Sequence, residues 1–415
     1  MRFATQPTRF KPSARIASAV SSAWLKQPSL IPTVNTTGSC SFLTQLDKYS
    51  SSETGTRQPP APSTRTMSEF CLLTVGSKIA VCSLSAGIKS KYHPRLDIVI
   101  NGLKQRGYEV VEGEFLRQNE PRTQLTAKQH AKQLMDFLLD DEIDAIMPPM
   151  GGELAMEILP LLDFGAIKNA KPKWLVGYSD VSTIACALTA KCNWATLHSA
   201  NLIQLHPDEK DPYCLQIFES LSYEANSEFE QAPSTYHQHS KPDYAQNPNV
   251  LFDRSAPTQW QCLNYTDKRS IEMSGRLFGG CLDTVGLLLD SPFLALHEFK
   301  KHNASQGIVL YLESAELTPA TVARFLLSLK LAGMFDDING VIIGRHVTLQ
   351  GQDLGFDYRQ GLNAAFGGCL FPVIIDADIG HIPPNLNLIN GALCTVTADV
   401  DQGKVISASV VTKLA

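Results

Sequence analysis

The sequence predicts an α/β protein in which two α/β regions are separated by a polar segment. Short apolar runs of strand length alternate with helical patterns from Lys78 onward, and the alternation resumes from Gly275. Such alternation is typical of a parallel sheet covered by helices on both faces. The 415 residues suffice for one large or two medium domains. We expect a leader (1–66), an N-terminal domain (67–206), a linker and loop segment (207–274) and a C-terminal domain (275–415).

The N-terminal region opens with a buried-strand pattern, followed by a helix pattern that stops at Gly107. Glycine just after the last periodic residue is a common helix end. The next helix has one apolar face, formed by Ala127, Ala131, Leu134, Phe137 and Leu138. The expected strands are 79–82, 108–111, 144–147 and a run from 174, and the expected helices are about 94–105, 126–139, 154–162 and 181–192.

Ser179 stands at the turn between the apolar run from Trp174 and the helix predicted from Val181. A strand that turns sharply into a helix projects the serine hydroxyl and leaves the first helical N–H groups unpaired. This is the geometry of a nucleophile elbow, with donors placed to hold an oxyanion. The alternative is that Ser179 and Asp180 only cap the helix, since both residue types favour that position. The Gly151-Gly152 turn lies at another strand end, where active sites of parallel sheets form.

Residues 207–274 are polar, with aromatic residues at Tyr236, Trp260 and Tyr265, and we interpret them as linker and loops with some short structure. The second region then alternates again, and its tail predicts a terminal hairpin over 392–400 and 405–411. The expected helices here are 282–289, 318–334 and about 359–366, and the expected strands are 307–313, 341–345 and 373–377.

Composition excludes several classes of protein. No apolar run reaches the roughly 18 residues of a membrane span. The ten cysteines include no C-x-x-C pair and no His-rich ligand spacing accompanies them, which argues against a zinc site and a disulfide framework. Residues 83–87 lack G-x-G-x-x-G, which disfavours dinucleotide binding. Residues 1–66 contribute +6 and the rest −11 to the net charge of −5, so the body has no electrostatic footprint for nucleic acid.

The leader, residues 1–66, is rich in Ser, Thr, Pro and Arg and has little hydrophobic periodicity, so we expect disorder. Acid-poor, Arg- and Ser-containing leaders can be organelle transit peptides. The alternative is an upstream extension without a role, because Met67 immediately precedes the first folded segment. The leader has no apolar core of the secretory type, so we expect a reducing, cytoplasmic location, or an organelle if it is a transit peptide.

Two further side chains could complete a site around Ser179. A serine nucleophile needs a base, and the base needs a third group to fix its tautomer. His381 follows an apolar run in a Pro-rich loop at a strand end. Glu313 closes the apolar strand 308–313, and a charge in that position needs a partner. Glu316 is the alternative candidate for this carboxylate, but we expect it at the start of the next helix, where acidic residues are common.

Six sequence blocks, in order, resemble the serine LD-carboxypeptidases, the family that includes the microcin C self-immunity proteins. The resemblance runs from about residue 77 to the end. The blocks are Gly151-Gly152, Leu159 to Asp163, Pro172 to Asp180, Gly275 to Leu282, Leu310 to Glu313 with Gly333 to Gly344, and Gly380 to Asn385.

The resemblance implies a Rossmann-like N-terminal domain, a C-terminal α/β domain and a Ser-Glu-His triad at their interface. It implies Ser179 as nucleophile, His381 as general base and Glu313 as its orienting carboxylate. The backbone N–H groups of Asp180, Gly151 and Gly152 would form the oxyanion hole. Such enzymes use no metal or cofactor and form homodimers.

The implied activity is metal-independent removal of the terminal D-amino acid from an L,D-peptide bond, as in peptidoglycan recycling. The alternatives are a peptidyl- or aminoacyl-nucleotide hydrolase of the microcin type and a catalytically silent protein that binds a small ligand. Trp260 is a candidate for stacking on a base, and Arg345 for holding a terminal carboxylate. The turn continues with Glu153-Leu154 where many relatives have Tyr-Gly, and Ile389-Asn390 replace a proline before Gly391. These departures bear on which substrate the protein would accept, and not on the chemistry that it would perform.

Overall fold

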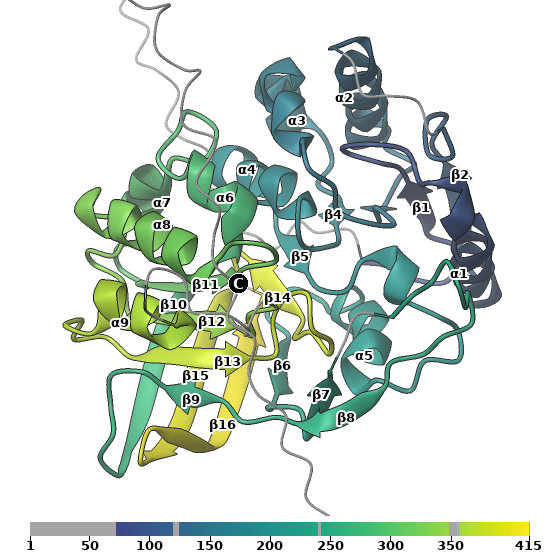
Figure 1. Ribbon diagram of the computed structural model, residues 1–415. Helices are drawn as coiled ribbons and strands as arrows, with labels where there is room; N and C mark the ends of the chain where they lie inside the picture. The colour runs from purple at the N-terminus through teal and green to yellow at the C-terminus, as the bar shows by residue number, and fades with distance from the viewer. Residues whose placement is uncertain (1–71, 119–123, 240–241, 348–354, 356, 415) are drawn as a thin grey trace, which may run out of the picture. The chain divides into compact units, whose positions relative to one another are not determined.

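The computed structural model describes residues 72–118, 124–239, 242–347, 355 and 357–414 (Figure 1). The predicted leader lies outside the described residues. The first described sheet has four parallel strands, in the order β2 (Glu109–Glu112), β1 (Lys78–Val81), β3 (Ala145–Ile146) and β4 (Trp174–Leu175). The prediction of a parallel N-terminal sheet is therefore confirmed.

Successive residues of these strands point to opposite faces of the sheet, and each face is covered by helices. Ala80, Ile146 and Leu175 pack in one core with the helices α2 (Gln124–Leu139) and α3 (Phe164–Asn169). The alternate residues, including Ile79 and Trp174, pack in a second core with α1 (His93–Gln105), which follows the short turn η2 (Ser90–Tyr92). Figure 1 shows α2 and α3 together, apart from α1.

The helix predicted over 154–162 is not an α-helix. The structure has two 3-10 turns instead, η3 (Ala155–Glu157) and η4 (Leu159–Leu161). Pro160 supplies no N–H and its ring disfavours a continuous α-helix here. The chain then enters α3, whose first turn is capped by Asp163, which accepts a hydrogen bond from the N–H of Ala166 at 2.9 Å.

Helix α4 (Val181–Cys192) lies at the centre of the fold and has the predicted bounds. It is buried almost all round, as its uniformly small and apolar sequence requires. Its apolar residues share one core with α2 and α3 and with residues of the second sheet, including Phe278 and Leu310. The helix that follows Ser179 is therefore fixed by both halves of the structure.

The second sheet carries the other half of the site. Its parallel strands are β10 (Arg269–Cys281), β11 (Ile308–Glu313), β12 (Gly340–Gly344) and β13 (Val373–Ala377). Antiparallel strands β15 (Leu393–Asp401), β9 (Gln261–Cys262), β16 (Lys404–Lys413) and β6 (Glu228–Gln231) complete it. Because β16 pairs with both β9 and β15, the pairings close the sheet on itself. The predicted terminal hairpin is β15 and β16. Helices α6 (Leu282–Leu288), α7 (Leu296–His302), α8 (Pro319–Leu331) and α9 (Tyr358–Phe366) accompany this sheet (Figure 1).

The segment 207–274 has more regular structure than the sequence analysis expects. It contains α5 (Pro212–Ser220), a strand pair formed by β7 (Tyr236–Gln238) and β8 (Arg254–Pro257), and strands β6 and β9 of the second sheet. A further antiparallel pair links the two halves: β5 (Thr196–His198), which follows α4, pairs with β14 (Leu388–Asn390). The short turn η5 (Leu202–Gln204) follows β5.

Candidate active site

Ser179 occupies a sharp turn between β4 and α4. Its φ angle is 65°, in the left-handed region that residues other than glycine rarely adopt. Gly177, two residues earlier, has a φ of 147°, and a side chain there would meet the Oδ1 atom of Asn201 at 2.4 Å. Asn201 Oδ1 instead accepts a hydrogen bond from the N–H of Tyr178 at 3.1 Å. The turn therefore has the constrained backbone of a nucleophile elbow.

The structure brings Ser179, His381 and Glu313 into one chain of contacts. The Nε2 atom of His381 lies 3.0 Å from Ser179 Oγ, and its Nδ1 atom lies 2.8 Å from Glu313 Oε2. A carboxylate only accepts hydrogen bonds, so Nδ1 carries the proton and Nε2 is free to accept from the serine hydroxyl. This is the arrangement needed for a base that takes the serine proton.

Glu313 is held ionised at the end of β11, where it is 1% exposed. Burial alone would raise the pKa of its carboxyl, but the attraction of His381 and the hydrogen bond between them bring the pKa below its ordinary value. The hydrogen bond with the Cys281 thiol lowers this pKa further. Gly380 makes the close approach possible, because a side chain there would lie 2.6 Å from Glu313 Oε2. By contrast, Glu316 is exposed.

The Gly151-Gly152 turn lies directly against Ser179. A side chain on Gly151 would lie 2.8 Å from Ser179 Oγ and 3.1 Å from the backbone nitrogen of Asp180. No hydrogen bond joins the N–H of Gly151 or Gly152 to another described residue. Of the residues expected to hold an oxyanion, Asp180 follows Ser179 directly and Gly151 lies against the serine hydroxyl, whereas a side chain on Gly152 would meet Ser85.

Two side chains fix this turn in place. Ser85 Oγ accepts hydrogen bonds from the N–H groups of Glu153 and Leu154, at 3.1 and 2.9 Å. The carboxylate of Asp180 accepts from the N–H of Ala155 at 2.9 Å. The backbone carbonyl of Asp180 accepts from the N–H of Thr183 at 3.2 Å, but its side chain makes no capping hydrogen bond to α4. The Asp180 carboxylate thus joins the elbow to the turn and does not act as the side-chain cap considered in the sequence analysis. Ser85 lies in the stretch 83–87, which was considered only for dinucleotide binding, and its role is seen only in the folded contacts.

Ser179 and His381 open into a cavity of about 790 Å³. Tyr92, Tyr178 and Tyr244 contribute aromatic rings to its lining, and the ring of Tyr178 lies edge-on to His381 at 4.8 Å between centroids. The charged lining residues are Lys89, Lys91, Glu153 and Asp243. Burial, and then the negative charges of Glu316, Asp180 and Asp283, raise the pKa of Glu153. The cavity can therefore accept a polar ligand of peptide size.

Trp260 and Arg345, the predicted substrate contacts, do not line this cavity. Trp260 is 1% exposed within the core of the second sheet, and its indole N–H donates to Asp378 Oδ2 at 2.9 Å. Arg345 is 5% exposed and pairs with Asp378 Oδ1 at 2.6 Å. Neither side chain is available to a ligand in the cavity. Tyr244, which the sequence analysis did not consider, is the aromatic residue of segment 207–274 that does line it.

His198 is a second histidine that the sequence analysis did not assign to the site. It ends β5, is 1% exposed, and its ring lies edge-on to Tyr311 and Tyr178 at 5.0 and 6.1 Å. Burial lowers the pKa of His198 to about 4, although the charge of Glu313 acts in the opposite direction. A neutral imidazole therefore lies beside the ionised Glu313. The pattern that identified Glu313, a polar residue closing a buried strand, also applies to His198.

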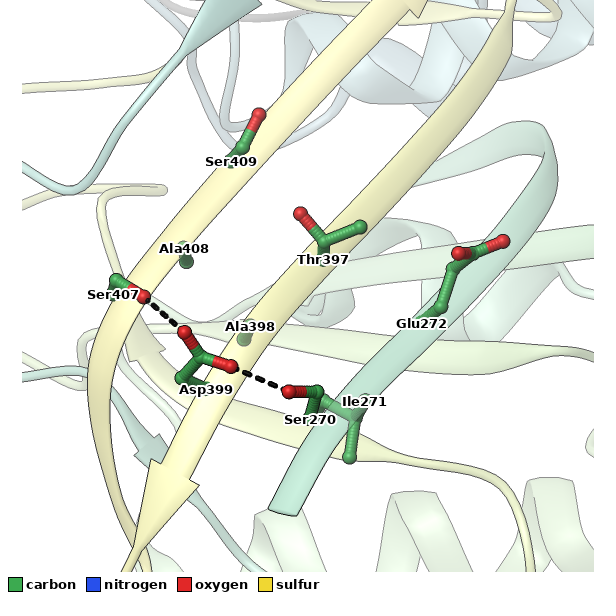
Figure 2. A pocket seen from close by; sticks show the side chains of 9 residues that line it. All are labelled: Ser270, Ile271, Glu272, Thr397, Ala398, Asp399, Ser407, Ala408 and Ser409. Carbon is green, nitrogen blue, oxygen red and sulfur yellow. Dashed lines mark hydrogen bonds between the residues drawn. The ribbon is translucent and has the colours of Figure 1, made fainter.

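A second hollow, of about 560 Å³, lies on the face of β10, β15 and β16 (Figure 2). Its hydroxyls come from Ser270, Thr397, Ser407 and Ser409, and Asp399 accepts hydrogen bonds from Ser270 and Ser407 at 2.6 and 2.9 Å. Its lining contains no histidine, lysine or cysteine, and its carboxylates, Glu272 and Asp399, are not joined to a serine through an imidazole as Glu313 is to Ser179. The cavity at Ser179 is the better candidate for chemistry.

Among the described residues, no cluster of His, Cys, Asp or Glu could hold a metal ion. Among the same residues, no helix is both long and apolar enough to cross a membrane.

Comparison with known proteins gives two family matches. Residues 79–199 match the LD-carboxypeptidase N-terminal domain, and residues 274–396 match the LD-carboxypeptidase C-terminal domain. The chain is 24% identical to the microcin C7 self-immunity protein MccF of Escherichia coli, over 79% of this chain and 92% of that protein. It is also 24% identical to a putative carboxypeptidase of Vibrio cholerae, over 79% and 94%. A probable murein peptide carboxypeptidase of Bacillus subtilis is 21% identical, over 72% and 82%.

Solved structures share the fold. MccF in complex with glutamyl sulfamoyl guanosine superposes with a TM-score of 0.68 at 22% identity, covering 81% of this chain and 97% of that one. An MccF-like protein from Bacillus anthracis gives 0.67 at 20% identity, covering 83% and 99%.

Proposed function

The chain belongs to the LD-carboxypeptidase family, and from that premise we propose that it is a serine carboxypeptidase that cleaves an L,D-peptide bond. Its substrate would be a small muropeptide whose terminal D-amino acid is released. The observation that carries the proposal is the chain of contacts from Glu313 through His381 to Ser179, at the edge of a cavity of peptide size.

The first half-reaction forms an acyl-enzyme. Ser179 Oγ attacks the carbonyl carbon of the scissile amide while His381 Nε2 takes the hydroxyl proton. Glu313 holds the Nδ1 proton and stabilises the imidazolium that forms. The N–H groups of Asp180 and of the Gly151-Gly152 turn stabilise the oxyanion, and one such donor is worth roughly 3–4 kcal/mol. His381 then gives the proton to the leaving nitrogen, the C–N bond breaks, and the D-amino acid departs.

The second half-reaction restores the enzyme. His381 takes a proton from water, the resulting hydroxide attacks the ester carbonyl, and the C–O bond to Ser179 breaks as the serine recovers its proton. The shortened peptide leaves with a new carboxylate. No step requires a group from outside the chain other than water and substrate.

A second candidate is hydrolysis of a peptidyl- or aminoacyl-nucleotide. It is favoured by the similarity to MccF along most of both chains, since MccF has been crystallised with glutamyl sulfamoyl guanosine. The same serine chemistry would cleave the amide of such a compound, and Tyr92 or Tyr244 offers a ring on which a base could stack.

Parallel assays separate the candidates. The purified protein is incubated with L-Ala-D-Glu-meso-diaminopimelate-D-Ala and, separately, with glutamyl sulfamoyl guanosine, and the products are measured by mass spectrometry. The proposal predicts release of D-Ala by the wild type and none by Ser179→Ala. Cleavage of the nucleotide analogue alone would favour the second candidate. A folded protein that binds either compound and cleaves neither would be a silent binding protein.

A further inference from the structure

The loop that carries His381 is fastened along its length by other segments of the chain. The loop is closed at its base by the N–H of Leu386, which donates to the carbonyl of Asp378 at 2.8 Å. Arg345 Nη2 donates to the carbonyls of Ile382 and Pro384, at 2.8 and 3.1 Å. The N–H of Gln238 donates to the carbonyl of Pro383 at 2.8 Å. The backbone carbonyls of all three residues that follow His381, residues 382 to 384, therefore accept a hydrogen bond.

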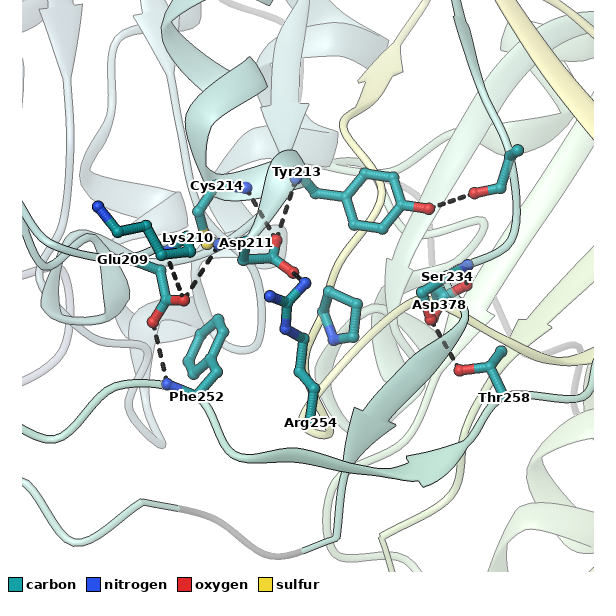
Figure 3. Close-up of polar contacts among 12 residues, drawn as sticks. Glu209, Lys210, Asp211, Tyr213, Cys214, Ser234, Phe252, Arg254, Thr258 and Asp378 are labelled. Atoms are coloured by element: carbon teal, nitrogen blue, oxygen red, sulfur yellow. Dashed lines mark hydrogen bonds and ion pairs between the residues drawn. The ribbon is translucent and has the colours of Figure 1, made fainter.

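The first residue of the loop, Asp378, is the centre of a buried polar cluster. Its carboxylate is inaccessible to solvent and accepts four hydrogen bonds. Arg345 Nη1 and Ser234 Oγ donate to Oδ1 at 2.6 and 2.5 Å, and Trp260 Nε1 and the N–H of Ser234 donate to Oδ2 at 2.9 and 2.8 Å. Figure 3 shows Thr258 beside Ser234 and Asp378, and its hydroxyl lies 2.7 Å from that of Ser234. A buried carboxylate that loses a donor is strongly destabilised, so the cluster fixes one position of the loop.

Most of these donors come from a part of the chain that neither family domain covers. Ser234, Gln238 and Trp260 lie between residues 199 and 274, the end of one match and the start of the next. They do not line the cavity at Ser179. They can therefore affect the reaction through the backbone of the loop that holds the His381 imidazole.

We propose that Arg345, Trp260 and Ser234 are positioning residues that act through Asp378 to hold His381 between Ser179 and Glu313. The inference rests on the proposed function, in which His381 is the base. His381 must stay within hydrogen-bond distance of two partners at once, and a displacement of about 1 Å can cost roughly 100-fold in rate. The segment expected to be a linker is thus part of the catalytic apparatus.

Trp260→Phe is the sharpest single test, because it keeps an aromatic ring and removes the donor to Asp378, together with some packing that a control must match. The matched control is Trp194→Phe: Trp194 is also 1% exposed, but its indole nitrogen has no hydrogen-bond partner among the described residues. Both variants lose similar packing. We expect kcat to fall about 10-fold in Trp260→Phe with KM unchanged, and no such fall in Trp194→Phe at equal thermal stability.

Arg345→Lys tests the rest of the cluster, since lysine cannot reproduce the fork that reaches Asp378 and two carbonyls. Its control is Arg254→Lys, because Arg254 also pairs with a fully buried carboxylate, but its side chain donates to Asp211, at 3.3 Å, and not to Asp378 (Figure 3). We expect kcat to fall about 100-fold in Arg345→Lys only. A rise in KM with kcat unchanged in either test variant would mean that these residues contact substrate, and would overturn the inference.

Two readouts that use no peptide separate this inference from the proposed function. The first is the rate at which a fluorophosphonate labels Ser179, which depends on the serine, the histidine and the oxyanion donors but not on recognition of a peptide. It should fall in Trp260→Phe and Arg345→Lys by the same factors as kcat. The second is the NMR resonance of the proton between His381 Nδ1 and Glu313, which should shift or broaden in both. A wild type that is not labelled contradicts the proposed nucleophile. Variants with the wild-type resonance contradict the positioning role, whether or not Ser179 reacts.

Discussion

Glu313 Oε2 lies 2.8 Å from His381 Nδ1, although the two residues are 68 positions apart in the sequence. Glu313 ends β11 and His381 follows β13, and both strands pair with β12 in the same parallel direction. The carboxyl ends of parallel strands share one edge of a sheet, so the topology delivers the two side chains to one place. Gly380 then allows their contact, because any side chain there would overlap the carboxylate.

Replacing Glu313 by Gln should reduce kcat strongly without abolishing it. An amide can still lie beside His381, but it no longer stabilises the imidazolium or selects the Nδ1 tautomer, and we expect a loss of about 10²- to 10⁴-fold. Steady-state kinetics with the tetrapeptide measures it. Glu316→Gln is the control, since Glu316 is exposed and its N–H, not its carboxylate, bonds to Asp283. Greater damage from the control would mean that Glu316 is the functional carboxylate.

Ser179→Ala and His381→Ala should each abolish turnover and leave the protein folded. Both remove a member of a unit that acts together, and the expected loss in kcat is about 10⁴-fold or more for each. The double variant should be no worse than either single one. Circular dichroism and thermal unfolding check the fold. Substantial activity in either single variant is incompatible with the proposed mechanism.

Gly151→Ala should impair catalysis through a direct overlap. The new methyl group would lie 2.8 Å from both Cβ and Oγ of Ser179, so either the serine or the turn must move. We expect kcat to fall about 100-fold, comparable to the loss of one oxyanion donor. Gly368→Ala is the matched control, because a side chain there meets no atom within 4 Å. If both variants keep wild-type kcat, the turn does not contribute to the oxyanion site.

His198 should make the protein less stable in acid. Burial lowers the pKa of its ring to about 4, against 6.5 for an ordinary histidine, so the unfolded chain binds a proton that the folded protein excludes. Stability is therefore lost as the pH falls from about 6.5 to about 4, by roughly 3 kcal/mol for this group. The pKa of Glu313 is also lowered, so further stability is lost as the pH falls below 4.5, the ordinary pKa of a glutamate. Urea unfolding at pH 7 and pH 4.5 should show a smaller loss in His198→Gln than in the wild type. Equal losses would contradict this account.

Local sequence patterns predicted most of the regular elements because those elements obey local rules. Helix α4 has the predicted bounds, and the terminal hairpin follows the predicted alternation. The helix predicted over 154–162 was wrong because Pro160 outweighs an apolar pattern that otherwise fits a helix. Strands β5 and β14 were missed because each is three residues long and is stabilised by its distant partner.

The contacts among Ser179, Glu313 and His381 could be anticipated because each side chain ends a strand or follows one. The positions of Trp260 and Arg345 could not, because their partner Asp378 is 118 and 33 residues away. An aromatic residue in a polar segment and an arginine at a strand end look the same in sequence whether they face a ligand or a buried carboxylate. Only the tertiary structure distinguishes the two.

The most direct test of the central claim is to trap the acyl-enzyme. The wild type is mixed with the tetrapeptide, quenched with acid within its turnover time, digested and mapped by mass spectrometry. The account predicts that the shortened peptide is attached as an ester to Ser179, and that the adduct is absent from His381→Ala. Release of D-Ala by a Ser179→Ala variant, with no adduct on the wild type, would contradict it.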